Sequence, residues 1–235
     1  MGIKVNQETL QMIADLSNAR GASGFEDETV QAAAKHIGEG YTTEEDCLRN
    51  FYMYRTANSG NKPVFMLDAH SDEVGFMVHS IRPNGTLRFV ALGGWNVGSL
   101  ASSKVLVRNS EGKYLPGVIA AKPVHFMSAS EKASAGAADI SSLSIDIGAV
   151  SAKDAAENFK IRIGEPGVPD VTLEYDEEHD LMFGKAFDCR IGCAALIETL
   201  RRLRDENRPG PARQWVPAGP PPSARSGAAP QPGCR

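Results

Sequence analysis

Phe183-Gly-Lys-Ala-Phe-Asp-Cys-Arg-Ile-Gly-Cys193 and the earlier stretch Leu67-Asp-Ala-His-Ser-Asp-Glu-Val-Gly-Phe76 decide the fold. In the earlier stretch, His70 and Asp72 form a His-x-Asp pair directly after an apolar run. An imidazole can bind a divalent cation, and a carboxylate two residues later can orient the ring. In the later stretch, Asp188 stands where a helix is expected to begin, and a carboxylate there can bridge two cations. The two stretches therefore predict half of a two-metal site, with His70 and Asp188 as ligands.

The segments around these motifs predict an α/β domain. Apolar residues recur at helical spacing within residues 10–14, 30–37 and 193–203, which predicts three amphipathic helices. Residues 64–67 form a continuous apolar run, as expected of a strand buried on both faces of a sheet. His70 would then lie just past the carboxyl end of a strand, where open α/β sheets place their ligands.

The pattern changes between residues 76 and 169. Short β-like runs alternate there with Asn-Gly and Gly-Gly turns, which predicts a small inserted all-β domain, a barrel. We therefore expect residues 1–75 and 170–207 to form the α/β domain and residues 76–169 the insertion. Residues 208–235 hold eight of the fourteen prolines, so we expect a disordered Pro/Ala/Arg-rich tail that continues neither helix nor sheet, and its abrupt composition suggests a frameshift.

Composition and charge exclude several classes of protein. The chain is 42% hydrophobic and 23% charged, and it has no apolar stretch of membrane-spanning length, so we expect a cytoplasmic protein. Four of the 25 basic residues lie beyond residue 207, so the preceding part carries 21 basic against 29 acidic residues, a net charge of −8. This balance argues against nucleic acid as a partner. The four cysteines form no CxxC motif, and the spacing of Cys189 and Cys193 indicates helix packing.

Seven short pieces, in order along the chain, resemble the glutamyl aminopeptidase family of dinuclear metallopeptidases, which includes the tetrahedral (TET) aminopeptidases. The similarity extends from about residue 10 to residue 207. The pieces are Gly21-Ala-Ser-Gly-Phe-Glu26, His70-Ser-Asp-Glu-Val-Gly-Phe-Met-Val78, Gly93-Gly94-Trp95, Gly117-Val-Ile119, Lys122-Pro-Val-His125, Ile145-Asp-Ile-Gly-Ala149 and Gly184-Lys-Ala-Phe-Asp-Cys-Arg-Ile-Gly-Cys193.

The resemblance implies a zinc-peptidase-like three-layer α/β domain, present here in part, with an inserted barrel that drives homo-oligomerisation. It implies a zinc- or cobalt-dependent aminopeptidase that acts on peptides. His70 would ligate one of two metal ions, Asp188 would bridge both, and Asp72 would be the catalytic-site carboxylate that hydrogen-bonds the metal-bound imidazole. The family's Glu-Glu pair, its further Asp and its final His find no match in this sequence. We therefore expect a C-terminally truncated member that binds metal weakly and is inactive.

Other interpretations of the same residues stay open at this point. Asp188 alone could simply cap the helix that follows it. We read Glu73 as a supporting or structural carboxylate, because alternate side chains of an extended segment point to opposite sides. His125 and His179 are expected to be surface histidines. For the whole chain, the alternatives are a noncatalytic oligomerisation or peptide-binding remnant, and an endoglucanase-like glycan hydrolase, which the lack of an identifiable acid and nucleophile pair disfavours.

Overall fold

The computed structural model describes residues 5–56, 66–122, 124–128, 139–205 and 214–216. Contacts divide the chain into two compact units. The first comprises Met1–Glu73 and Thr172–Arg235, and the second comprises Val74–Val171. Each unit has its own hydrophobic core.

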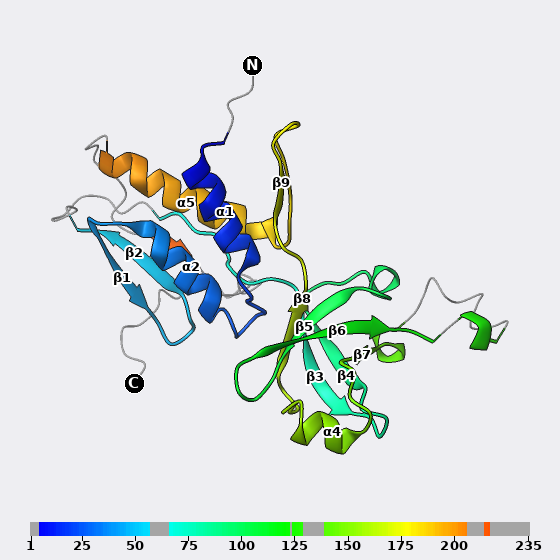
Figure 1. Cartoon of the computed structure of the whole chain (residues 1–235). Helices are drawn as coiled ribbons and strands as arrows, with labels where there is room; N and C mark the ends of the chain where they lie inside the picture. Colours follow the sequence, from blue (N-terminus) through cyan, green and yellow to red (C-terminus); the bar gives the residue numbers. More distant parts are fainter. Residues whose placement is uncertain (1–4, 57–65, 123, 129–138, 206–213, 217–235) are drawn as a thin grey trace. The chain divides into compact units, whose positions relative to one another are not determined.

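Three helices form most of the first unit: α1 (Gln7–Asn18), α2 (Asp27–Ile37) and α5 (Phe187–Asp205). Both α1 and α2 pack against α5 (Figure 1). Met12 and Leu16 of α1 are fully buried in one core with Ile197 and Leu200 of α5, as their helical spacing requires. The three helices expected from the apolar periodicity are confirmed.

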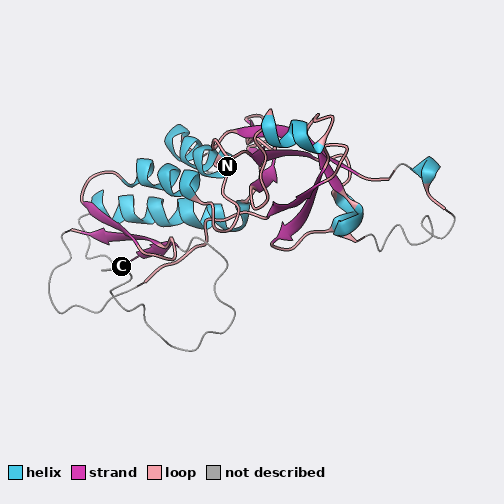
Figure 2. Ribbon diagram, turned by 90° about the horizontal axis from the view of Figure 1, so that it is seen from below, coloured by secondary structure: helices cyan, strands magenta, loops and turns pink. Residues whose placement is uncertain are grey.

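A small antiparallel sheet lies on one side of these helices (Figure 2). It has the order β1 (Tyr41–Glu45), β2 (Phe51–Arg55), β11 (Gln214–Val216), with β2 in the middle. Phe51 and Met53 of β2 are buried in the helical core, so this strand joins the sheet to the helices. A separate hairpin pairs β9 (Glu174–Asp176) with β10 (Leu181–Phe183).

Two sequence expectations need correction in this unit. The tail was expected to continue no sheet, but Gln214–Val216 pairs with β2 from Phe51 to Met53. Proline bars sheet pairing only at its own position, and the short Gln-Trp-Val run leaves backbone groups free to pair. The sequence also predicted a strand over residues 64–67. Residues 66 and 67 belong to no strand or helix, and residues 64 and 65 lie outside the described residues.

The second unit is a closed six-stranded barrel, as the sequence predicts. Its strands follow the order β3-β4-β7-β6-β5-β8 around the barrel, and every described pairing is antiparallel (Figure 1). The strands are β3 (Gly75–Ile81), β4 (Leu87–Leu92), β5 (Lys104–Arg108), β6 (Tyr114–Ala120), β7 (Ser144–Asp146) and β8 (Pro166–Pro169). Where this unit is described, the segments between the strands include η1 (Val97–Ser99), η2 (Val124–Phe126), η4 (Ile140–Ser142) and α4 (Ala152–Glu157).

Alternating side chains fill the barrel. In β4, Leu87 is completely buried whereas Val90 is 42% exposed, so successive positions face the interior and the solvent. The ring of Phe76 meets Phe89 edge-on and stacks on Trp95, which closes the interior with aromatic contacts.

Gly85 and Gly112 are among the barrel's turn glycines with positive φ, at +88° and +78°. Their surroundings differ. A Cβ atom at Gly85 would overlap the carbonyl oxygen of Ala149, whereas a Cβ atom at Gly112 would meet nothing within 4 Å. Gly85 is therefore held by both conformation and space, and Gly112 by conformation alone.

Candidate metal centre

The predicted ligands come from two segments of the first unit that are far apart in sequence. His70 and Asp72 lie in an irregular stretch of the chain that precedes β3, and Asp188 lies at the beginning of α5. Asp188 and Cys189 both have non-helical φ and ψ angles, and the peptide bond between them is cis. The regular part of α5 therefore starts after them, and the Asp188 side chain, 97% exposed, projects from the helix start.

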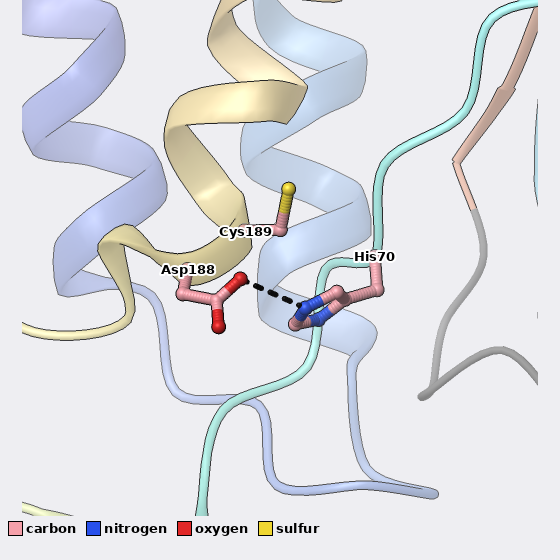
Figure 3. Close-up of side chains that lie close together, drawn as sticks. All are labelled: His70, Asp188 and Cys189. Carbon is pink, nitrogen blue, oxygen red and sulfur yellow. Dashed lines mark hydrogen bonds and ion pairs between the residues drawn. The ribbon is translucent and has the colours of Figure 1, made fainter.

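The structure brings His70, Asp72 and Asp188 together. Nδ1 of His70 lies 3.0 Å from Oδ1 of Asp72, and Nε2 lies 3.3 Å from Oδ1 of Asp188 (Figure 3 shows the second contact). The imidazole thus lies between two carboxylates. The Asp72 side chain is 12% exposed, so one carboxylate is largely enclosed while the other faces solvent.

The two contacts give the two ring nitrogens of His70 different surroundings. When Nδ1–H donates to Asp72, the lone pair of Nε2 is free on the side that faces Asp188. Burial raises the pKa of Asp72, and the neighbouring His70 partly offsets this shift by favouring the charged carboxylate. Asp72 therefore orients the imidazole from one side, whereas the exposed carboxylate of Asp188 faces its other nitrogen.

Cys189 also belongs to the group, although the sequence pattern did not predict it. Its Sγ atom, a ring nitrogen of His70 and a carboxylate oxygen of Asp188 all lie within 4.8 Å of one another (Figure 3). Cys193 behaves as expected: it is buried in the helical core, burial raises the pKa of its thiol to about 12, and its Sγ–H donates to the carbonyl of His70 at 3.3 Å. The position of Cys189 directly after Asp188 could have indicated a metal ligand. Its spacing of four residues from Cys193 instead suggested that both cysteines pack on one helical face.

In the described part of the chain, the carboxylate of Asp188 does not cap α5. Its described contact is the one to His70, and within the described residues no backbone N–H donates to its carboxylate. His125 and His179 are exposed, as predicted, and His179 bonds to Asp176 in the β9–β10 hairpin loop.

Residues 50–215 match the profile of the M42 glutamyl aminopeptidase family, and this range includes all three predicted site residues. The chain belongs to the M42 glutamyl aminopeptidase family. The glutamyl aminopeptidase of Lactococcus lactis subsp. cremoris is 32% identical over 203 residues, which cover 86% of this chain and 57% of that protein. This M42 member thus spans less than three fifths of that curated relative.

Solved structures agree with the family. A TET aminopeptidase from the marine sediment archaeon Thaumarchaeota archaeon SCGC AB-539-E09 superposes with a TM-score of 0.81 at 31% identity, covering 89% of this chain and 58% of that one. The TET1 peptidase of Pyrococcus horikoshii gives a TM-score of 0.73 at 25% identity, covering 88% and 59%. The partial three-layer domain with its inserted barrel is therefore the M42 fold.

The side chains of this M42 member fit a divalent metal ion. Two ligand atoms that each lie about 2.0 Å from a tetrahedral ion are roughly 3.3 Å apart. The Nε2–Oδ1 distance of 3.3 Å between His70 and Asp188 has this value. Imidazole nitrogen, carboxylate oxygen and thiol sulfur are also the donor types that zinc and cobalt accept. The donor set and its spacing therefore suit such an ion.

A buried polar cluster lies behind this site. Oε1 of Glu73 accepts from Nζ of Lys185 at 2.9 Å and lies 3.5 Å from the guanidinium of Arg190. Glu73 also accepts from the backbone N–H of Gly21 at 3.0 Å, and its side chain is 1% exposed. These enclosed contacts agree with the supporting or structural role expected of Glu73.

Arg190 connects the two segments that carry the predicted ligands. Its Nε donates to the carbonyl of Ser71 at 2.9 Å, beside His70, while Arg190 itself stands two residues after Asp188. Its other nitrogens donate to the carbonyl groups at the end of α1, those of Leu16, Ser17 and Ala19. Burial lowers the pKa of Arg190 and of Lys185, and Glu73 opposes both shifts.

No helix in the described part of the chain is both long enough and apolar enough to cross a membrane.

Proposed function

We propose that this chain carries part of the metal site of an aminopeptidase that removes N-terminal residues from peptides. The observation that supports this most directly is the His70 ring, which is oriented by Asp72 and presents Nε2 3.3 Å from the exposed carboxylate of Asp188. Membership of the M42 family and the similarity to a curated glutamyl aminopeptidase support the same activity.

The three residues take distinct roles in this proposal. His70 would hold one cation through Nε2, and Asp188, whose carboxylate faces solvent, would help to hold both. Asp72 holds the imidazole in the tautomer that binds metal and raises its basicity. Two divalent ions, zinc or cobalt, would supply Lewis acidity and make a water molecule nucleophilic near neutral pH.

The described residues bring no further imidazole or carboxylate into this group. We therefore propose that the chain as given binds divalent metal weakly and turns over peptides poorly, because the second ion of the proposed pair would have only Asp188 as a ligand among the described residues, and because a separate general base normally removes the proton from water. The glycan hydrolase alternative is disfavoured, since both site carboxylates contact one imidazole instead of flanking a space for a sugar.

Equilibrium dialysis with Zn²⁺ or Co²⁺ tests the site. We expect His70→Ala and Asp188→Ala to abolish binding and Asp72→Asn to weaken it about 10- to 100-fold. His179→Ala is a matched control, because His179 is exposed in another hairpin. Equal binding by wild type and His70→Ala would refute the metal site and favour a noncatalytic remnant.

An activity assay with aminoacyl p-nitroanilides and cobalt or zinc tests the expected lack of turnover. Turnover that His70→Ala abolishes would overturn that expectation while supporting the aminopeptidase class. Release of reducing sugar from a glucan would instead favour the glycan hydrolase.

We further propose that the barrel mediates self-association. The solved relative from Pyrococcus horikoshii is described as assembling into a tetrahedron or a large octahedral shell. The barrel exposes apolar side chains at Val90, Val118 and Phe126, with exposed fractions of 42%, 43% and 74%. Light scattering should give a mass that is a multiple of 25.2 kDa, and the double variant Val90→Lys/Val118→Lys should lower it. A monomeric wild type would contradict this proposal.

A further inference from the structure

We propose that Cys189 supplies a third protein ligand, a thiolate, to the metal ion held by His70 and Asp188. The site would then prefer cations that accept sulfur, such as Zn²⁺, Co²⁺ and Cd²⁺, over Mn²⁺ and Mg²⁺. This inference rests on the metal site of the proposed function and goes beyond it by naming a ligand and the metal class that it selects.

The local backbone of α5 places this thiol at the site. Cys189 has φ −119° and ψ 31°, outside the helical region, so it does not continue the helical face on which Cys193 is buried. Figure 3 shows Cys189 beside Asp188 and His70, at the start of the helix. The three ligand atoms lie within 4.8 Å of one another, and they offer one nitrogen, one oxygen and one sulfur.

Bond lengths show how little the thiol has to move. Ligand atoms about 2.0 Å and 2.3 Å from a tetrahedral ion, the usual lengths for nitrogen and sulfur on zinc, are roughly 3.6 Å apart. Sγ of Cys189 lies at most 4.8 Å from the ligand atoms of His70 and Asp188. To reach a separation of roughly 3.6 Å it has to move by about 1 Å, which rotation about one side-chain bond can supply. The pair His70–Asp188 already has the ligand spacing, at 3.3 Å.

The neighbouring Gly192 leaves the space in which the thiol lies. A Cβ atom at that position would come within 2.6 Å of Cys189 Sγ and 3.0 Å of Ala69 Cβ. Any larger residue would therefore displace the sulfur or the segment that leads into His70. This contact ties the position of the thiol to the loop that carries the imidazole.

Three protein ligands leave one tetrahedral position open, which is the arrangement of a catalytic zinc site. When the metal binds, the S–H bond breaks, the proton passes to solvent and the sulfur lone pair forms the bond to the metal, with no change of oxidation state. Thiolate ligands select zinc-like cations, whereas oxygen-only sites suit magnesium and manganese. Cys189 therefore sets the metal preference of this site.

Cobalt spectroscopy on the whole chain tests the proposal without any activity assay. Adding Co²⁺ under a reducing, thiol-free buffer should produce a thiolate-to-cobalt charge-transfer band in the near ultraviolet. Cys189→Ser should remove the band and lower the preference for Cd²⁺ over Mn²⁺ by about tenfold or more. Cys47→Ser is the matched control, because Cys47 is an exposed cysteine outside the metal group, and it should leave the band unchanged.

A second measurement needs no variant and so does not depend on refolding. Zn²⁺ should slow the alkylation of Cys189 by iodoacetamide, followed by peptide mass spectrometry, and should leave the alkylation of Cys47 unchanged. If Co²⁺ binds in a His70-dependent manner but the band is absent, or persists in Cys189→Ser, the thiolate ligand is refuted and the metal site survives. If no His70-dependent binding occurs, both the ligand and the proposed function fail.

Discussion

Replacing Arg190 by methionine should destabilise the helical unit far more than its size suggests. The guanidinium is 1% exposed and donates to Ser71 and to carbonyl groups at the end of α1, besides facing Glu73. Methionine keeps much of the apolar volume but removes every one of these donors. The carbonyl acceptors would then be buried without partners, and Glu73 would retain only Lys185 and a backbone N–H.

The magnitude follows from these contacts. A hydrogen bond from a charged donor contributes about 1.5–3 kcal/mol, and at least three of the carbonyl contacts have good distances. Relief from burying the guanidinium, which lowers the pKa of Arg190, offsets part of the loss. We expect a net loss of about 4 kcal/mol in the free energy of unfolding, against a typical total of roughly 5–15 kcal/mol.

Urea denaturation followed by circular dichroism measures this loss, and hydrogen exchange of peptides from α1 and α5 locates it. Arg190→Lys should lose about half as much, because it keeps a charge for Glu73 but not the fork of donors. Arg202→Met is the surface control, since that side chain is 73% exposed and pairs with Glu198; it should cost about 0.5 kcal/mol or less. If Arg190→Met and Arg202→Met unfold at the same urea concentration, the account of the cluster is wrong.

Three further predictions concern stability. Gly85→Ala should cost clearly more than Gly112→Ala, for which we expect about 1 kcal/mol from positive φ alone, and thermal denaturation of the two variants checks the difference. Leu87→Ala, in the barrel core, should cost about 2–5 kcal/mol while Val90→Ala on the surface should cost well under 1 kcal/mol; similar urea midpoints would contradict the barrel interior described above. Burial raises the pKa of Asp15, but hydrogen bonds from the side chains of Lys35, His36 and Gln11 lower it to about 2, below its unfolded value of 3.8. The contribution of these contacts to stability is therefore present above pH 4 and is lost as pH falls towards 2. Asp15→Asn should flatten this dependence in urea midpoints measured from pH 5 to 2, and an unchanged slope would refute it.

Much of the fold could be predicted from local patterns. The barrel strands alternate buried and exposed positions, and the helices carry stripes of apolar residues, so period alone identified both. The hairpin of β1 and β2 escaped notice because Tyr41–Glu45 is polar and mostly exposed. The pairing of Gln214–Val216 could not be predicted for a different reason. Its partner strand lies about 160 residues earlier, and no local pattern encodes that contact.

The site could be predicted only as far as spacing and resemblance reach. His70 and Asp72 are two residues apart, so their contact follows from sequence. The approach of Asp188, 118 residues from His70, was implied by the family resemblance. Cys189 was not predicted as a ligand because its spacing from Cys193 was read as helical. The backbone is not helical at Asp188 and Cys189. The departure from regular geometry, which sequence patterns cannot show, is what adds the thiol to the group.

The barrel's first and last strands are neighbours, since β3 pairs with β8 through Phe76 opposite Gly167 and Met77 opposite Pro166. The chain therefore enters and leaves this unit side by side, and a short bridge of a few residues could close the gap between the two ends. Val74–Val171 thus has the form of a cassette that could be excised, produced alone, or exchanged for the barrel of a relative without stretching the polypeptide on either side.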